Sequence, residues 1–271
     1  MCCLFLAASS TVAIAQTNVV DLVNPIIGTN GMGHTFPGAC VPFGLVQLSP
    51  DTDTIPHNVD GKYQPRSYEY CAGYQHKDSS IVGFSHTHFS GTGHSDLGDI
   101  LIMPTTGTLK LNPGTATNPD GGYRSRFSHD TEISRPGYYE VMLADYGVKA
   151  QLTTTQRAGI HKYTYPTNSE NQRIILDMIH GIYNYDGKVL WTNIRVENDT
   201  LVTGYRITNG WARTNYTYFA MSFSKPITHY GCEEKAKVDY RGGYAKFNMK
   251  ENFPDIGGRK IVAYFDFDPK M

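Results

Sequence analysis

Residues 83–99, GFSHTHFSGTGHSDLGD, combine in one short segment the residue types that most often carry chemistry. Three histidines, two aspartates and four glycines fall within these seventeen residues. Histidine side chains form hydrogen bonds, transfer protons or bind metals, and glycine lets the backbone approach a ligand closely. The composition therefore predicts that this segment forms one wall of a functional site.

His86 and His88 leave three interpretations open. If residues 81–89 are extended, side-chain alternation puts both imidazoles on one face, where they could bind a metal. Candidates for the third ligand are His94, Asp96 and Asp99. The other interpretations are contacts with a sugar or a domain interface, and buried histidines that bond to backbone and hydroxyl groups.

A glycine-rich segment precedes this one at residues 24–50. Its glycines resemble a phosphate-binding loop, but Pro37 and Pro42 exclude the helix whose N-terminus would hold the phosphate. We interpret it as a loop that lines a ligand, with Asp51 directly after it. No nucleophile-elbow pattern surrounds the serines near the histidines, so a nucleophilic serine is a weak hypothesis.

Residues 67–78, SYEYCAGYQHKD, place several aromatic rings beside Cys71. The rings belong to Tyr68, Tyr70, Tyr74 and His76. Aromatic rings stack on the apolar faces of sugars, so a carbohydrate subsite is one interpretation. The alternative is a row of tyrosines on a half-buried strand edge.

The overall composition excludes some partners and indicates a fold class. A net charge of -1 gives no electrostatic case for nucleic acid or for an anionic membrane surface. The 19 tyrosines and 27 glycines, with only 18% charged residues, suggest many strands joined by tight turns. A chain of 271 residues can bury one large core.

Residues 137–267 carry the pattern of strands, while residues 24–107 show little periodicity and resemble a loop-rich functional face. Runs rich in Val, Ile, Thr, Tyr and Phe alternate with Asp-Gly, Asn-Gly, Gly-Gly or Asn-Asp turns. The predicted strands are 138–144, 149–155, 161–165, 173–178, 188–197, 201–208, 216–222, 236–240, 244–249 and 260–267. The pattern predicts an all-β fold, a large antiparallel sandwich with few or no long helices.

The N-terminus indicates export. Residues 1–15 form an apolar run that closes on Ala13-Ile14-Ala15, which matches the cleavage rule of a secretory signal peptide. The run is too short to span a bilayer, so we expect a secreted or periplasmic protein without a membrane span. Cleavage leaves Cys40, Cys71 and Cys232, which allow at most one disulfide.

Three long segments closely resemble the N-terminal domain of glycoside hydrolase family 92, the secreted exo-acting α-mannosidases. They read VNPIIGTNGMGHTFPGACVPFGLVQLSPDT, YCAGYQHKDSSIVGFSHTHFSGTGHSDLGDILIMP and RPGYYEVMLADYGVKAQLTTTQRAGIHKYTYP. The resemblance implies a galactose-mutarotase-like supersandwich over residues 16–271, which full-length members continue into an (α/α)6 domain. It further implies calcium dependence and inversion of the anomeric centre, which needs one acid and one base.

In the family, both catalytic carboxylates and the main calcium ligands lie in the (α/α)6 domain, which is absent here. The resemblance therefore implies no catalytic residue and no metal ligand within this chain. It carries over only an N-terminal wall of the mannose pocket, in which Tyr70 takes a position that is often Trp. The implied substrate-binding residues are Gly33, His34, Gly38, Tyr70, Cys71, Ser85, His86, His88 and His94.

The sequence thus predicts the N-terminal sandwich of an α-1,2-mannosidase-like enzyme that acts on mannose-containing glycans. Its partners would be the glycan and the C-terminal catalytic domain of the same polypeptide, and the chain alone would be inactive. One alternative is a freestanding carbohydrate-binding sandwich. Another is a small metal-dependent hydrolase built on His86, His88 and Asp96.

Overall fold

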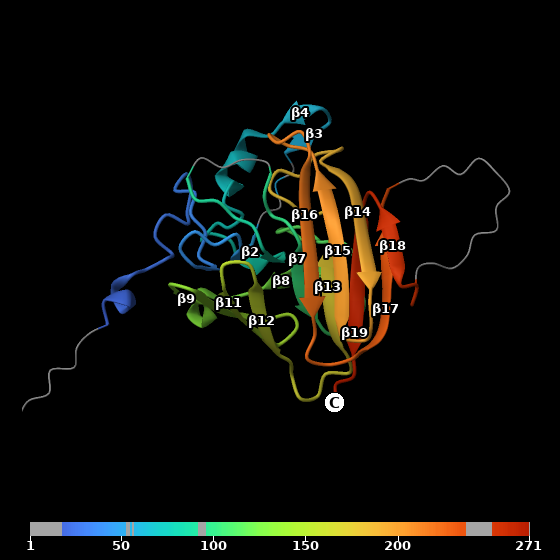
Figure 1. Ribbon diagram of the computed structural model, residues 1–271. Helices are drawn as coiled ribbons and strands as arrows, with labels where there is room; N and C mark the ends of the chain where they lie inside the picture. Colours follow the sequence, from blue (N-terminus) through green and yellow to red (C-terminus); the bar gives the residue numbers. More distant parts are fainter. Residues whose placement is uncertain (1–17, 53–54, 56, 92–95, 237–250, 271) are drawn as a thin grey trace, which may run out of the picture.

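The computed structural model describes residues 18–52, 55, 57–91, 96–236 and 251–270, which form stacked antiparallel sheets (Figure 1). The central sheet has seven strands in the order β1-β2-β6-β7-β13-β19-β17. These strands are β1 (Ala39–Cys40), β2 (Gln47–Asp51), β6 (Gly83–Ser85), β7 (Leu101–Thr105), β13 (Gln172–Asp177), β19 (Ile261–Phe267) and β17 (Ile227–Glu234). Residues 1–15, the predicted signal peptide, lie outside the described residues.

Two four-stranded sheets accompany the central one. One has the order β12 (Gly159–Thr164), β11 (Val148–Thr154), β10 (Tyr138–Leu143) and β9 (Ile133–Arg135). The other has the order β16 (Asn215–Ser222), β15 (Leu201–Thr208), β14 (Val189–Val196) and β18 (Asp255–Gly258). Two small ladders pair β3 (Asn58–Val59) with β4 (Lys62–Tyr63), and β5 (Ser80–Ile81) with β8 (Ser125–Arg126).

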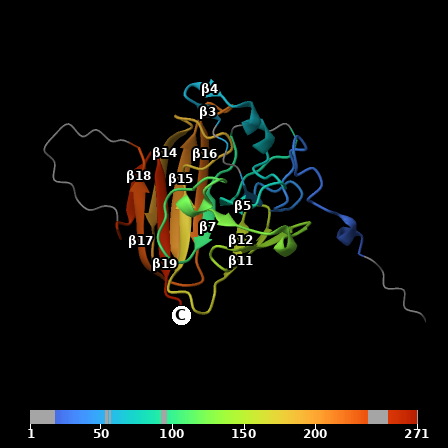
Figure 2. The same ribbon diagram turned by 180° about the vertical axis from the view of Figure 1, so that it is seen from behind.

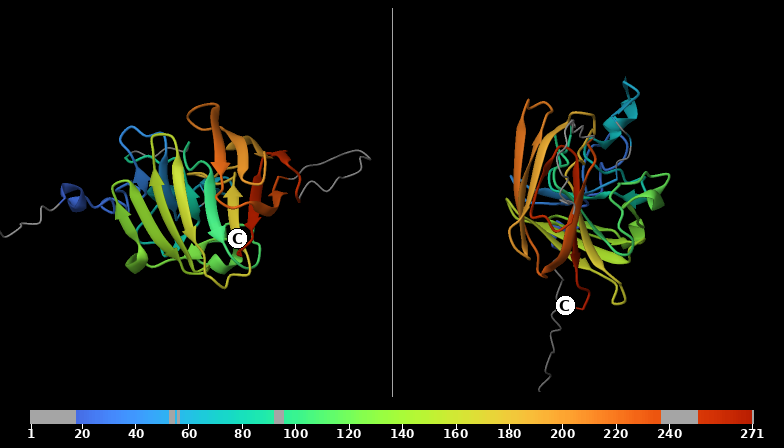
Figure 3. Two further views of the ribbon diagram at one scale, coloured as in Figure 1. Left: turned by 60° about the horizontal axis from the view of Figure 1, so that its bottom comes forward. Right: turned by 90° about the vertical axis from the view of Figure 1, so that its right-hand side faces the viewer.

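The middle strands of the central sheet are buried on both faces. One core cluster joins Ile175 of β13 to Val141 and Leu152 of the β9–β12 sheet. A second cluster joins the next residue, Leu176, to Ile194 of the β14–β16 sheet. Successive strand residues point to opposite faces, so β13 needs apolar side chains on both. Figure 3, in its right-hand view, shows the orange strands on one side of β19 and green to yellow segments on the other.

The described strands confirm the predicted all-β sandwich. Eight of the ten predicted strands form, each within two residues of its expected ends. The other two, 236–240 and 244–249, lie outside the described residues except for Ala236. Helical structure in the described part is confined to the short 3-10 helices η1 (Val19–Leu22), η2 (Pro65–Tyr70), η3 (Pro119–Gly121) and η4 (His129–Thr131).

The expectation for residues 24–107 needs correction. Residues 24–107 are not only a functional face, because they contribute β1, β2, β6 and β7 to the central sheet. These strands have two to five residues and are mostly buried, so they show no alternation that a pattern search could detect. Figure 2 nevertheless shows the blue to cyan loops gathered at one side of the sheets.

Among the described residues, no helix has the length and hydrophobicity needed to cross a membrane. No disulfide links Cys40, Cys71 and Cys232, the cysteines among the described residues. The one disulfide that the sequence allowed is therefore not formed.

The double burial of β13 generates a test. Ile175→Ala and Leu176→Ala each remove a fully buried side chain, one from each face of the strand. Both should lower the free energy of unfolding by about 2–5 kcal/mol in urea titrations, because each leaves a cavity. Lys162→Ala on the exposed face of β12 serves as the control. If one of the two core variants is tolerated like the control, β13 does not lie between two packed layers.

Candidate functional site

Residues 83–99 form the connection between the antiparallel strands β6 and β7. Two backbone hydrogen bonds close its base: the His86 amide donates to the Asp99 carbonyl, and the Gly98 amide donates to the Thr87 carbonyl, both at 2.9 Å. The predicted site residue His94 lies outside the described residues. The strand itself ends at Ser85, so side-chain alternation does not extend to His86 and His88.

Asp51, the last residue of β2, is a fully buried carboxylate held between two histidines. Its Oδ1 lies 2.8 Å from Nε2 of His88, and its Oδ2 lies 3.0 Å from Nε2 of His180. Burial alone would raise the pKa of Asp51, but the charges and hydrogen bonds of His88 and His180 outweigh it and hold that pKa well below its usual range. Asp51 is therefore a buried, ionised anchor that joins β2, the 83–99 segment and the chain after β13.

Ser85 lies beside this cluster, but the geometry does not form a nucleophilic triad. Its Oγ is 3.2 Å from Nε2 of His88, the same nitrogen that faces Asp51. A triad needs the serine and the carboxylate on opposite ring nitrogens. Here the other nitrogen, Nδ1, lies 2.8 Å from the carbonyl oxygen of Gln47. Ser85 and His88 therefore brace the loop, in line with the weak serine signal in the sequence.

Arg206 of β15 forms a second buried ion pair, with Asp99. Its Nε and Nη2 donate to Oδ1 of Asp99 at 3.1 and 2.5 Å, and Oδ2 accepts a hydrogen bond from the Thr87 hydroxyl at 2.8 Å. Nη1 of Arg206 donates to the carbonyls of Met178 and His180. Both charged side chains are at most 1% exposed. The pair thus fixes the 83–99 segment to the β14–β16 sheet and to the chain after β13.

His86 begins a chain of neutral hydrogen bonds that leads to β12. Burial lowers the pKa of His86 to about 4 and that of His161 well below its usual range, so both rings are neutral. Nδ1 of His86 donates to the Ile100 carbonyl at 2.7 Å, which leaves its Nε2 to accept from Nε2 of His161 at 3.0 Å. Nδ1 of His161 then accepts from the Tyr163 hydroxyl at 2.7 Å. Each ring nitrogen has one assigned role, and a proton added to either ring breaks the chain.

Three non-glycine residues with strained backbones adjoin the segment. His34, Ile100 and Tyr183 have φ values of 51°, 55° and 55°, a region that β-branched and bulky residues rarely adopt. The His34 carbonyl accepts from Gly91, Ile100 directly follows the segment, and Tyr183 follows Ile182, whose amide donates to Leu97. Such strained backbone conformations persist only where many surrounding contacts hold them in place.

Close contacts with the neighbouring backbone require glycine at positions 33 and 38. A Cβ at Gly33 would lie 2.2 Å from the Gly28 carbonyl oxygen, and one at Gly38 would lie 2.2 Å from that of Leu48. His34 packs edge-on against Tyr68 with ring centroids 5.0 Å apart. Its Nε2 is buried and meets no hydrogen-bond partner among the described residues. Nε2 of His34, a predicted site residue, is thus available to bond a ligand.

Tyr70 and Cys71 are buried beside the same loops. The Tyr70 hydroxyl donates to the Asp78 carboxylate at 2.9 Å, and Cys71 Sγ lies 3.0 Å from the Tyr68 carbonyl oxygen. The structure therefore brings Ser85 and His88 together on Asp51 and gives His86, Tyr70 and Cys71 separate partners. Contact of the predicted residues with a sugar stays a prediction.

The metal triad of His86, His88 and Asp96 does not assemble. The Nε2 atoms of the two histidines are bonded to the different partners described above. The Asp96 carboxylate accepts from the amides of Trp211 and Ala212 at 2.7 and 3.1 Å. Asp96 therefore caps the turn at residues 211–212. The hypothesis of a hydrolase built on these three residues is therefore wrong in its geometry.

Sequence reasoning missed His180 and Arg206, both central to the buried network. Arg206 did leave a signal, because it shares the inward face of β15 with Val202 and Thr208. A charged residue at an inward position implies a buried partner of opposite charge. His180 left no such signal, since it follows β13 in an irregular stretch.

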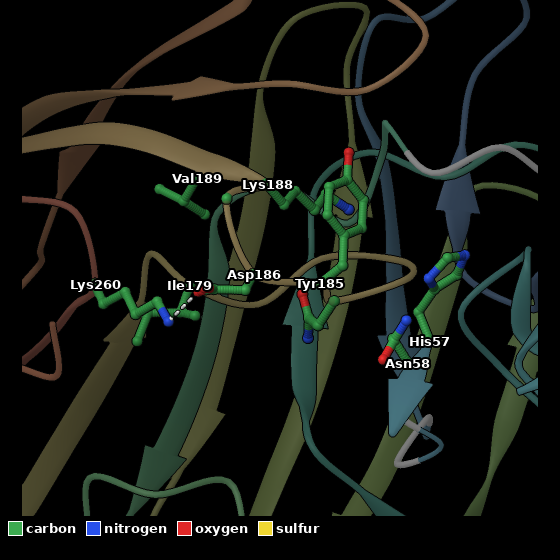
Figure 4. A pocket seen from close by; sticks show the side chains of 10 residues that line it. His57, Asn58, Ile179, Tyr185, Asp186, Lys188, Val189 and Lys260 are labelled. Carbon is green, nitrogen blue, oxygen red and sulfur yellow. Dashed lines mark hydrogen bonds and ion pairs between the residues drawn. The ribbon is translucent and has the colours of Figure 1, made fainter. Parts of the chain in front are cut away.

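A pocket of about 700 Å³ opens near the chain after β13 (Figure 4). Its lining includes His57, Ile179 and Tyr185, together with Lys260, whose Nζ lies 2.8 Å from Asp186 Oδ1. The volume is within the range of small-molecule sites. None of the residues predicted to bind substrate lines it, so this pocket was not expected from the sequence.

The buried ion pair predicts a large and specific loss of stability. Arg206→Met leaves the Asp99 carboxylate buried and uncompensated, so the free energy of unfolding should fall by about 3–5 kcal/mol. Adding Asp99→Asn should restore part of the loss, because it removes the stranded charge. Lys260→Met, which breaks an exposed pair, should give no resolvable change. Urea unfolding that shows equal effects for Arg206→Met and Lys260→Met would contradict the anchoring role.

The neutral histidine chain predicts a dependence on pH. The pKa of His86 is about 4 in the folded protein against an ordinary value of 6.5, so between these values the unfolded chain binds more protons. The free energy of unfolding should therefore fall as the pH is lowered through this window, and be fully retained above it. His161→Gln should flatten the slope, and His229→Gln on β17 should not. An unchanged slope in His161→Gln would show that the pair does not titrate as described.

Comparisons with known proteins agree with the fold. The sequence model of the Glycosyl hydrolase family 92 N-terminal domain matches residues 22–271. A family GH92 alpha-mannosidase from Bacteroides thetaiotaomicron, solved in complex with mannoimidazole, is 41% identical with a TM-score of 0.79, over 92% of this chain and 30% of that chain. The family GH92 inverting mannosidase from B. thetaiotaomicron VPI-5482 is 25% identical with a TM-score of 0.65, over 96% and 30% of the two chains.

A protein from Arthroderma benhamiae described as an uncharacterized secreted glycosidase is 29% identical over 170 residues, which are 59% of this chain and 19% of that protein. The chain thus spans less than a third of the length of each of these relatives. The family match covers nearly all of the chain, and the three-layered sheet arrangement agrees with it. The chain therefore belongs to glycoside hydrolase family 92, of which it carries the N-terminal domain.

Proposed function

We propose that this chain is the N-terminal sandwich of a secreted, calcium-dependent, inverting exo-α-mannosidase, α-1,2-mannosidase-like, that acts on mannose-containing glycans. The observation that carries the proposal is the 41% identity, over 92% of the chain, to an alpha-mannosidase solved with mannoimidazole. In this proposal the sandwich supplies one wall of the mannose site. A C-terminal (α/α)6 domain of the same polypeptide supplies the catalytic acid and base.

The buried network supports a structural role for this wall, with no acid or base of its own. Inverting hydrolysis needs an acid and a base that reach the sugar and an attacking water. Asp51 is enclosed by His88 and His180, and Asp99 by Arg206 and Thr87. These carboxylates are placed to hold the loop in shape, and the proposed work of the loop is to position sugar hydroxyls.

The same two carboxylates do not fit a calcium site. Calcium takes six to eight oxygen ligands. All four carboxylate oxygens of Asp51 and Asp99 are already bonded to histidine, arginine or threonine groups. We therefore propose that the calcium ligands lie in the C-terminal domain, and we assign this chain no step that uses the ion.

Exposed apolar side chains in the N-terminal loops support docking of the C-terminal domain. Large apolar side chains are exposed along the loops of residues 19–45 and at Phe89 in the predicted wall. The exposed set within those loops is Val19, Val20, Leu22, Val23, Ile27, Met32, Phe43 and Leu45. Exposed apolar groups mark interaction sites where they form a patch. The His34 carbonyl accepts a hydrogen bond from the Gly91 amide, so a partner packed on the loop around His34 would lie next to the 83–99 segment.

Export of the protein is also a proposal. The apolar N-terminus with its small-residue cleavage pattern supports a signal peptide over residues 1–15. The A. benhamiae relative is described as secreted. A secreted or periplasmic location would suit an enzyme of glycan breakdown.

A second candidate function, freestanding carbohydrate binding, is favoured by one observation. Tyr216 and Tyr218 of β16 are exposed on one face with ring planes 9° apart, and Tyr205 of β15 lies against Tyr218 with centroids 5.7 Å apart. Exposed aromatic rings in a row suit stacking on sugar rings. Calorimetry of the chain alone with mannobiose separates the candidates, because only the freestanding binder needs no second domain.

The proposed function predicts activity that depends on both domains. The chain alone should release no mannose from an α-1,2-linked mannobiose with calcium present. A longer polypeptide, in which the family's helical domain follows residue 271, should release it and lose activity in a calcium chelator. Mannose can be measured by a coupled enzymatic assay, with anomeric configuration followed by NMR. Release of mannose by the chain alone, or retention of the anomeric configuration, would refute the proposal.

A further inference from the structure

Two histidines and a glutamate converge away from the network around Asp51. His76 follows the Tyr70–Gln75 turn region, while His129 belongs to η4 and Glu132 follows it directly. One ligand atom from each of these three residues lies within 4.8 Å of the others. Nδ1 of His129 is 2.6 Å from Oε2 of Glu132, and the two imidazole centroids are 3.9 Å apart.

His76 brings an unmet polar atom to this cluster. Its Nδ1 is buried and has no hydrogen-bond partner among the described residues. A buried imidazole nitrogen without a partner costs free energy, so such atoms call for an explanation. Its ring lies against the imidazole of His129. A cation bound between the two imidazoles would be a ligand partner for both.

Two buried tyrosine hydroxyls hold the Glu132 carboxylate in position. Its side chain is only 2% exposed. Oε1 accepts hydrogen bonds from the hydroxyls of Tyr74 at 2.9 Å and Tyr139 at 2.6 Å. Hydrogen bonds of this kind orient a ligating carboxylate. The other oxygen, Oε2, also lies 3.0 Å from the Tyr74 hydroxyl and is the oxygen that faces Nδ1 of His129 at 2.6 Å.

We propose that His76, His129 and Glu132 form a zinc site. Two imidazoles and one carboxylate are a donor set typical of Zn²⁺, whereas calcium prefers oxygen ligands alone. The partly exposed His129 leaves a fourth position open to water. The ion takes the place of the hydrogen bond between His129 and Glu132 and gives Nδ1 of His76 a partner. It ties the segment around residue 76 to η4 and to β9, at the edge of the β9–β12 sheet.

The site is tested by zinc titration of the untagged chain with a competing chromophoric chelator. The wild type should bind one Zn²⁺ per chain, with calcium present in excess, and its melting temperature should rise with zinc. His129→Ala should weaken zinc binding roughly 100-fold or more, because it removes a ligand. Tyr139→Phe, which removes an orienting hydrogen bond, should weaken it about 10–100-fold.

His229→Ala is the matched control. His229 on β17 also lies beside a carboxylate, with Nδ1 3.5 Å from Asp266 Oδ2, but it joins no group of three metal-ligating residues in the described part of the chain. The variant should bind zinc like the wild type. Melting without zinc checks that each variant is folded. Absence of stoichiometric zinc in the folded wild type, or equal affinity in His129→Ala, would overturn the proposal.

Discussion

The buried ion pair between Arg206 and Asp99 is the interaction on which the arrangement of the candidate site depends. Its two charges lie at most 1% exposed, in a place where an unpaired charge is very costly. Arg206 also binds the carbonyls of Met178 and His180, so one side chain joins the β14–β16 sheet, the chain after β13 and the 83–99 segment. Asp51 then becomes a second anchor, because His180 is held where it can reach the carboxylate.

The central sheet explains why such anchors are available. Its middle strands are packed on both faces, so the loops at their ends start from fixed positions in a dense core. The charges of Asp51, Asp99 and Arg206 at this end of the sheet are buried and need partners, and the partners come from different layers. The strained backbones of His34, Ile100 and Tyr183 are tolerated because these contacts over-determine the loop.

The sequence predicted the outer layers of the fold better than its centre. Successive residues of β10, β11 and β16 alternate between a more buried and a less buried face, so periodicity located these strands. β2, β6 and β7 are short and buried, and β17 is stabilised by pairing with β19, so local pattern could not identify them. For the site, the sequence identified the 83–99 segment. It could not pair His88 with Asp51 or Asp99 with Arg206, since those contacts span 37 and 107 residues.

The central claim is that residues 83–99 form a rigid wall braced from within. Amide hydrogen exchange of the folded chain tests it most directly. The amides of His86 and Gly98, which donate to Asp99 and Thr87, and that of Ile182, which donates to Leu97, should exchange as slowly as those of β7 and β13. Exchange of these three amides at the rate of an exposed loop, while β7 and β13 stay protected, would contradict the claim.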